Sequence, residues 1–184
     1  MKVSEIINLC NEMSNLQLPP DCHNVFDSET VNENETAKRL ITCCNAVLED
    51  VYCNYCTAIA TANVFAQNGF IDTSQMALAR VLKLTTKRGF NVKYRYTANG
   101  LLTEDGEYVL TYAKLPPKVG WDSEVVLPGP RITERILAYG ILAEYFFGIE
   151  DLQLAEAWQT RYLNALRVAR LKTSSMTLPV GKWS

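Results

Sequence analysis

The feature that most constrains the fold is an apolar stripe between positions 34 and 56. Its residues recur three and four positions apart, as one face of an α-helix requires. They are Ala37, Leu40, Ile41, Cys44, Val47, Leu48, Val51 and Tyr55. A helix with one apolar face is stable in water only when other elements cover that face. The stripe therefore predicts a helical core, for which the rest of the chain has to supply the partners.

Three further segments repeat this periodicity and are the predicted partners. They cover residues 4–17, 131–147 and 150–171, and Gly148 separates the last two. Helices joined by short connections pack as antiparallel neighbours. With the helix over 34–56, they predict a four-helix bundle made of two N-terminal and two C-terminal helices.

The middle of the chain, about residues 57–115, has a different pattern. It is rich in β-branched and aromatic residues and is punctuated by the turn signals Asn99-Gly100 and Asp105-Gly106. We expect a small antiparallel sheet there, inserted on one side of the bundle. A proline-bounded segment around Trp121 is expected to be an exposed loop that leads back to the helices.

The predicted fold class is therefore mainly α, with a four-helix core, an inserted β region and an extended C-terminal tail. Residues 1–172 are expected to form a single domain, and residues 173–184 the tail. The longest apolar stretch, Ile132 to Ile149, contains three charged residues and is shorter than the ~20 residues that a bilayer requires. We expect no contact with a membrane.

The charges are unevenly distributed although the formal net charge is only −2. The first 56 residues hold nine acidic and three basic side chains, and no acidic residue follows Glu156. A near-neutral total argues against a dedicated nucleic-acid-binding protein, which normally has a basic excess. Opposite charges at the two ends suit contacts between identical copies, or the docking of a basic tail on an acidic partner; a merely solvated surface is the alternative. The expected contact residues are Glu33, Glu35, Arg161, Arg167 and Arg170.

Six cysteines in the first third of the chain raise the question of a metal or thiol site. Cys22-His23 and Cys53-x-x-Cys56 offer ligands of the right kind for tetrahedral zinc. The spacing disfavours such a site, because Cys53 and Cys56 fall at the end of a helix and no second CxxC follows. We expect reduced thiols, most of them buried as small apolar groups, with no metal and no cofactor.

Other chemistry finds little support in the chain. His23, the only histidine, is adjacent to a cysteine, and adjacent residues rarely form a nucleophile and base pair. Carboxylates near Glu104 are expected to be solvated side chains of a turn. Basic and aromatic residues interleave over 87–96, as in single-strand binders, but the alternation of a half-buried strand explains them more simply. We expect no catalytic residue and no enzyme.

The C-terminal tail combines apolar residues with basic ones. Segments of this kind often become ordered on a partner, with Trp as a common anchor. The expected partner-binding residues are Lys172, Leu178, Pro179, Val180 and Trp183. A frayed terminus is the alternative.

Several segments resemble the head-to-tail adaptors of tailed bacteriophages, also called connector, head-completion or packaged-DNA stabilisation proteins. At the N-terminus these are Val3-Ser4-Glu5-Ile6-Ile7-Asn8 and the helix from Glu35-Thr36-Ala37 to Cys44-Asn45-Ala46-Val47-Leu48-Glu49-Asp50. In the middle they are Arg95-Tyr96-x-x-x-Gly100-Leu101-Leu102-Thr103, Tyr108-Val109-Leu110-Thr111-Tyr112 and Leu115-Pro116-Pro117. Near the end they are Ile136 to Tyr145 and Ala157-Trp158-Gln159-x-x-Tyr162-x-x-Ala165-Leu166.

The resemblance implies a structural protein of the virion, made in the host cytoplasm and located at the head–tail junction. Such an adaptor binds beneath the portal protein as a ring of about twelve copies. It closes the DNA exit, touches the passing double-stranded DNA without sequence readout, and presents a surface to the next tail or neck protein. By position, residues 172–184 match the family's portal-binding tail. Another neck or tail-completion protein is the nearest alternative, and a small zinc or thiol enzyme is a more distant one.

Overall fold

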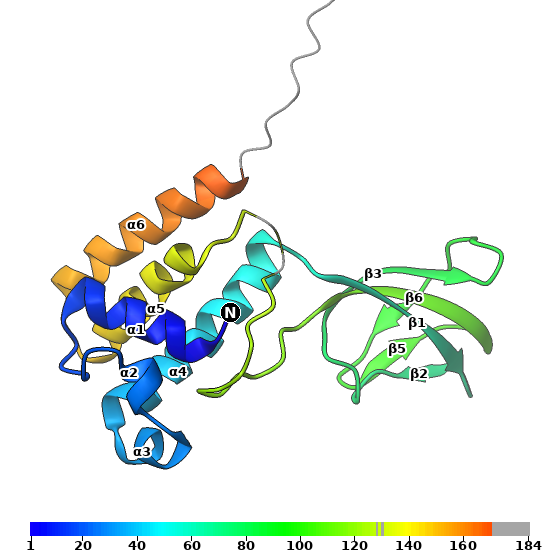
Figure 1. Ribbon diagram of the computed structural model, residues 1–184. Coiled ribbons are helices and arrows are strands. Elements are labelled where there is room, and N and C mark those ends of the chain that lie inside the picture. The colour runs from blue at the N-terminus through cyan, green and yellow to red at the C-terminus, as the bar shows by residue number, and fades with distance from the viewer. Residues whose placement is uncertain (128, 130, 171–184) are drawn as a thin grey trace, which may run out of the picture.

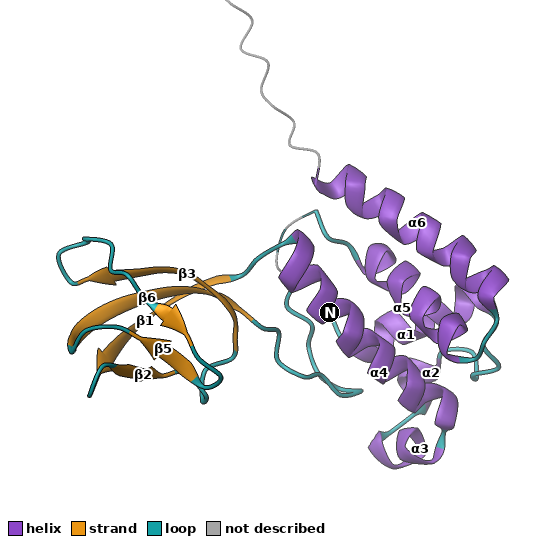
Figure 2. Cartoon of the chain, turned by 180° about the vertical axis from the view of Figure 1, so that it is seen from behind, coloured by secondary structure: helices purple, strands orange, loops and turns teal. Residues whose placement is uncertain are grey.

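The computed structural model describes residues 1–127, 129 and 131–170. Figures 1 and 2 show two lobes, one made of helices and one of strands. The portal-binding residues expected in the tail, from Lys172 to Trp183, lie outside the described residues.

The helical lobe contains six α-helices. They are α1 (Val3–Ser14), α2 (Cys22–Val25), α3 (Ser28–Glu33), α4 (Glu35–Asp50), α5 (Glu134–Gly148) and α6 (Leu152–Arg170). A π-helical turn, Val51–Tyr55, continues α4 towards the strands. The expectation for this region lacked α2 and α3, which are short and lie in a polar, acidic segment where no apolar periodicity reveals them.

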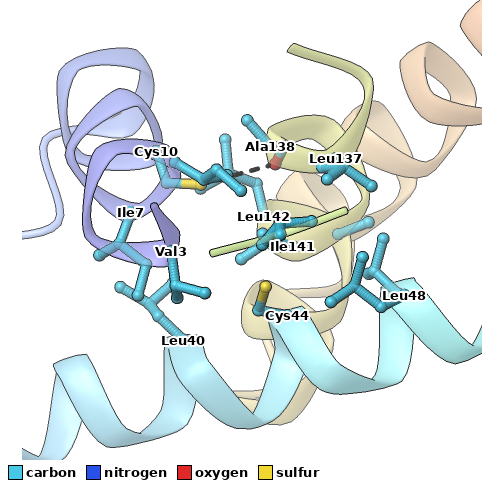
Figure 3. Close-up of a cluster of buried hydrophobic side chains, with 14 of the residues drawn as sticks. Val3, Ile7, Cys10, Leu40, Cys44, Leu48, Leu137, Ala138, Ile141 and Leu142 are labelled. Carbon is cyan, nitrogen blue, oxygen red and sulfur yellow. Dashed lines mark hydrogen bonds between the residues drawn. The ribbon is translucent and has the colours of Figure 1, made fainter. Parts of the chain in front are cut away.

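Helix α5 is the centre of this lobe. It is apolar on nearly every side, and α1, α4 and α6 all pack against it. Figure 3 shows how side chains of α1, α4 and α5 meet, among them Ile7, Leu40 and Leu137. At Gly140 the packing is tight, because a Cβ atom there would lie 2.9 Å from side-chain atoms of both Val47 and Tyr162.

The strand lobe contains two three-stranded antiparallel sheets. One has the order β1 (Ile59–Ala66), β6 (Gly106–Lys114), β3 (Leu78–Thr86), and the other has β2 (Phe70–Asp72), β5 (Gly100–Leu102), β4 (Arg95–Tyr96). A second core lies within this lobe, separate from the helical core. Its buried members are Ala66, Ile71, Val81, Leu84, Leu101, Tyr108 and Leu110.

The prediction of a mainly α protein built on a four-helix bundle is therefore wrong. The protein has 45% helix and 23% strand in a mixed α/β fold. The sequence signal failed at β1, where alanines and Val64 face inward while Ile59 and Phe65 face solvent. This reverses the usual apolar-in pattern, so the sequence of β1 does not reveal which of its faces is buried.

The segment around Trp121 also differs from its expectation. Trp121 is buried in the helical core, and its indole Nε1 donates a hydrogen bond to the carbonyl of Phe26, 3.2 Å away. The side-chain amide of Asn45 forms two hydrogen bonds with the backbone of Val119: it donates to the carbonyl at 2.9 Å and accepts from the N–H at 2.8 Å. The connection is therefore part of the helical lobe and not an exposed loop.

Candidate functional site

The candidate functional site is a groove between α5 and α6. The two helices are joined by a short turn in which Glu150 adopts φ +64°, and α6 packs through only one of its faces. The cavity has a volume of about 360 Å³. We call it the α5–α6 groove. It is lined by Ala143, Glu144, Phe147, Leu152, Ala155, Glu156 and Gln159.

The groove combines apolar walls with carboxylates. Phe147 is 65% exposed and Leu152 is 63% exposed, although both are large apolar side chains. Glu144 and Glu156 are the only charged residues of its lining. Exposed apolar surface of this kind, edged by charge, is typical of a site for another macromolecule. The arrangement suits a partner that brings an apolar side chain together with a positive charge.

A second cavity continues this surface across α5 to α4. It has a volume of about 380 Å³ and shares Glu144 with the α5–α6 groove. Glu35 and Lys38 on its α4 side form an ion pair with an N–O distance of 2.6 Å. The face formed by α4, α5 and α6 is therefore concave in two places, with Glu144 between them.

Burial makes several of the cysteines poor nucleophiles. Cys10, Cys22 and Cys44 are buried, whereas Cys43, Cys53 and Cys56 are half-buried, so the core position expected for Cys53 and Cys56 is only partly met. Burial raises the pKa of the Cys44 thiol to about 12 and that of Cys43 to about 11. A thiol with such a pKa is protonated at neutral pH and is a poor nucleophile.

The residues considered above as zinc ligands do not come together. Within residues 1–127, 129 and 131–170, no group of three or more His, Cys, Asp or Glu side chains could hold a metal ion. The Cys22 thiol lies 3.5 Å from the side-chain oxygen Oδ1 of Asn8, to which it donates a hydrogen bond. Nδ1 of His23 is buried without a hydrogen-bond partner among the described residues.

The basic and aromatic residues of the strand lobe are more exposed than expected. Phe90 is 69% and Tyr96 is 61% exposed, so a half-buried strand does not account for them. Only Arg95 and Tyr96 of this segment belong to a strand, β4. Tyr94 and Tyr96 pack edge to face with ring centroids 5.5 Å apart.

The expected inter-subunit residues are spread over the helical lobe. Glu33 and Glu35 are exposed where α3 meets α4. The Arg161 guanidinium lies over the Trp158 ring, 4.6 Å from its centroid. Arg167 is exposed in the last turn of α6, and Arg170 ends that helix. These residues do not form one patch.

The charges divide by lobe more sharply than by chain end. Residues 57–118, which form the strand lobe and its connections, hold eight basic and four acidic side chains. Residues 1–56 and 119–170 together hold eight basic and sixteen acidic ones. This division is hidden in the sequence because the basic lobe lies in the middle of the chain, between two acidic segments that fold together.

Comparisons with known proteins add no assignment. No protein-family model matches the chain, and no curated protein matches it in sequence. Among the described helices, none is both long and apolar enough to cross a membrane.

Proposed function

We propose that this protein is a non-enzymatic head-to-tail adaptor of a tailed bacteriophage. About twelve copies form a ring beneath the portal protein, close the DNA exit and connect to the next tail or neck component. The protein is made in the host cytoplasm and resides at the head–tail junction of the virion. Passing double-stranded DNA is touched without sequence readout.

The observation that carries this proposal is the exposed apolar and acidic α5–α6 groove. Large apolar side chains exposed side by side on a folded lobe indicate a surface that a partner covers. The cysteine thiols, which are the most reactive nucleophiles in the chain, are instead buried or half-buried. This combination supports a role in assembly over a role in catalysis.

The positions of the adaptor-like segments give further support. The resembling segments 3–8, 35–50, 136–145 and 157–166 fall in α1, α4, α5 and α6, which pack around α5. The resembling segments between residues 95 and 112 fall in β4, β5 and β6. The adaptor-like segments therefore include the helices that form the helical core and parts of the strand lobe.

In this proposal the helical lobe forms the ring wall and the tail reaches the portal. The inter-copy contacts include Glu33, Glu35, Arg161, Arg167 and Arg170. The portal contacts are Lys172, Leu178, Pro179, Val180 and Trp183, with Trp183 as the anchor because a large aromatic side chain contributes most to such interfaces.

A binding experiment with portal rings of the same phage tests the proposal. The full chain is expected to bind, whereas a variant that lacks residues 173–184 is expected to lose binding and to keep its circular dichroism spectrum. Binding by the shortened variant would overturn the role of the tail. No binding by the full chain, together with binding to a tail protein, would favour a tail-completion function instead.

A further inference from the structure

The end of the strand lobe farthest from the helices has a hydrogen-bonded turn with an exposed aromatic ring. The loop after β3 closes through hydrogen bonds from the Gly89 N–H to the Thr86 carbonyl and from the Thr86 N–H to the Phe90 carbonyl, each 2.9 Å long. Gly89 adopts φ +86°, a conformation that a glycine adopts easily. The turn therefore holds Phe90 outside the lobe in a defined position.

Two more features belong to the same end. Phe65, which is 61% exposed, pairs with Glu107 in the register of β1 and β6, and Lys87 forms an ion pair with Glu107. We call Phe65, Lys87, Arg88 and Phe90 the distal tip. Figures 1 and 2 agree that the loop after β3 points away from the helical lobe. No part of the same copy's helical lobe covers the distal tip.

The distal tip and the α5–α6 groove are complementary. The tip offers aromatic rings beside cations, and the groove offers the apolar walls Phe147 and Leu152 beside the carboxylates Glu144 and Glu156. The lobes that carry them have opposite net charge, because basic residues exceed acidic ones in the strand lobe and the reverse holds in the helical lobe. Opposite potentials steer association and fix its orientation.

We propose that the distal tip of one copy docks in the α5–α6 groove of the next copy. Phe90 enters the groove between Phe147 and Leu152, and Arg88 lies against Glu156. Because the tip and the groove are different surfaces, the contact is head-to-tail. Its repetition closes a ring when the rotation between copies divides a full turn, and gives an open filament otherwise. This inference rests on the proposed ring-forming function and identifies the surfaces that build the ring.

A nucleic acid is the competing occupant of the distal tip, since aromatic rings beside cations also bind bases and phosphates. Two observations favour a second copy. Lys87 is already paired with Glu107. In addition, sixteen acidic side chains in the helical lobe make the rest of the molecule unfavourable for a polyanion.

Photocrosslinking tests the contact directly. Phe90 is replaced by photoreactive benzoylphenylalanine, and isotopically heavy and light copies are mixed, with and without portal rings and a short DNA duplex. We expect heavy-to-light crosslinks from position 90 to residues 143–159. Rings on the portal without these crosslinks would overturn the docking but leave the adaptor function intact. No rings at all would overturn both, and crosslinks to the duplex would favour the nucleic acid.

A charge-reversal pair provides a second measurement. Arg88→Glu and Glu156→Lys are each expected to weaken copy-to-copy association by about fivefold per contact, as for exposed ion pairs, and the double variant to restore it to within about twofold. Lys93→Glu is the matched control, an exposed cation of the same lobe outside the distal tip. The Arg88–Glu156 pairing would be contradicted if the double variant lost affinity by the product of the two single fold-losses.

Discussion

The Tyr162 hydroxyl donates a hydrogen bond to Oδ2 of Asp50, 2.8 Å away, and so joins α6 to the end of α4. Tyr162 is buried, and its burial together with this bond raises its pKa. We expect Tyr162→Phe to lower the free energy of unfolding by about 1.5–3 kcal/mol, the usual contribution of a hydrogen bond to a charged group. Urea denaturation followed by circular dichroism measures the change.

Tyr139→Phe is the matched control for that variant. The Tyr139 hydroxyl accepts a hydrogen bond from Nε of Arg135 in an exposed position, 2.7 Å away. Water can replace this bond, so we expect the free energy of unfolding to change by less than about 0.5 kcal/mol. Equal effects of the two variants would show that the Tyr162–Asp50 bond contributes nothing specific.

Gly140→Ala tests the tight packing of α5 between α4 and α6. In an open helix this change stabilises by about 1 kcal/mol, but here the added methyl group would press on Val47 and Tyr162. We expect a net destabilisation of about 1–3 kcal/mol, as for other overpacked cores, in chemical denaturation. Gly148→Ala, with no atom within 4 Å of the new Cβ, should be neutral or stabilising. Stabilisation by both changes would contradict the close approach.

The two separate cores predict that the lobes respond separately to mutation. Leu110 is buried in the strand core and Leu137 in the helical core. Truncation of either to Ala should lower the free energy of unfolding of its own lobe by about 2–5 kcal/mol. Trp121 and Trp158 both belong to the helical core. We therefore expect Leu137→Ala to shift the tryptophan fluorescence midpoint in urea more than Leu110→Ala does. Equal shifts would indicate that the lobes unfold as one unit.

The buried thiols predict a loss of stability at alkaline pH. Burial raises the pKa of Cys44 from its ordinary value of 9.0 to about 12. As the pH rises, the unfolded state therefore releases this proton before the folded state does. The contribution of the Cys44 thiol to the free energy of unfolding is constant below about pH 9 and is lost as pH rises from 9 towards 12. For one proton, the free energy of unfolding falls by at most about 1.4 kcal/mol per pH unit. Cys44→Ala should make the decline measured by urea denaturation shallower, and an unchanged slope would exclude Cys44 as a source.

The main helices were predictable from the sequence because their apolar residues recur at helical spacing. The predicted range 34–56 became α4 and its π-helical turn, and 150–171 became α6. The strand lobe was underestimated because β2, β4 and β5 are only two or three residues long. Their contribution becomes visible only when they pair and enclose Ile71 and Leu101.

The candidate site was less predictable than the fold. Glu35 was expected at an interface and lines the cavity beside the α5–α6 groove. Phe147 was not singled out, and Leu152 fits the apolar face of the helix expected over 150–171, although it is 63% exposed. Only the packing of α6 through a single face reveals that they remain open to a partner.

Mass photometry of this protein mixed with portal rings of the same phage tests the adaptor function most directly. We expect a discrete increase in the mass of the portal ring that corresponds to a full ring of about twelve copies. The protein alone can be monomeric, since the portal can template the assembly. No increase in mass at micromolar concentrations of both proteins would contradict the adaptor function.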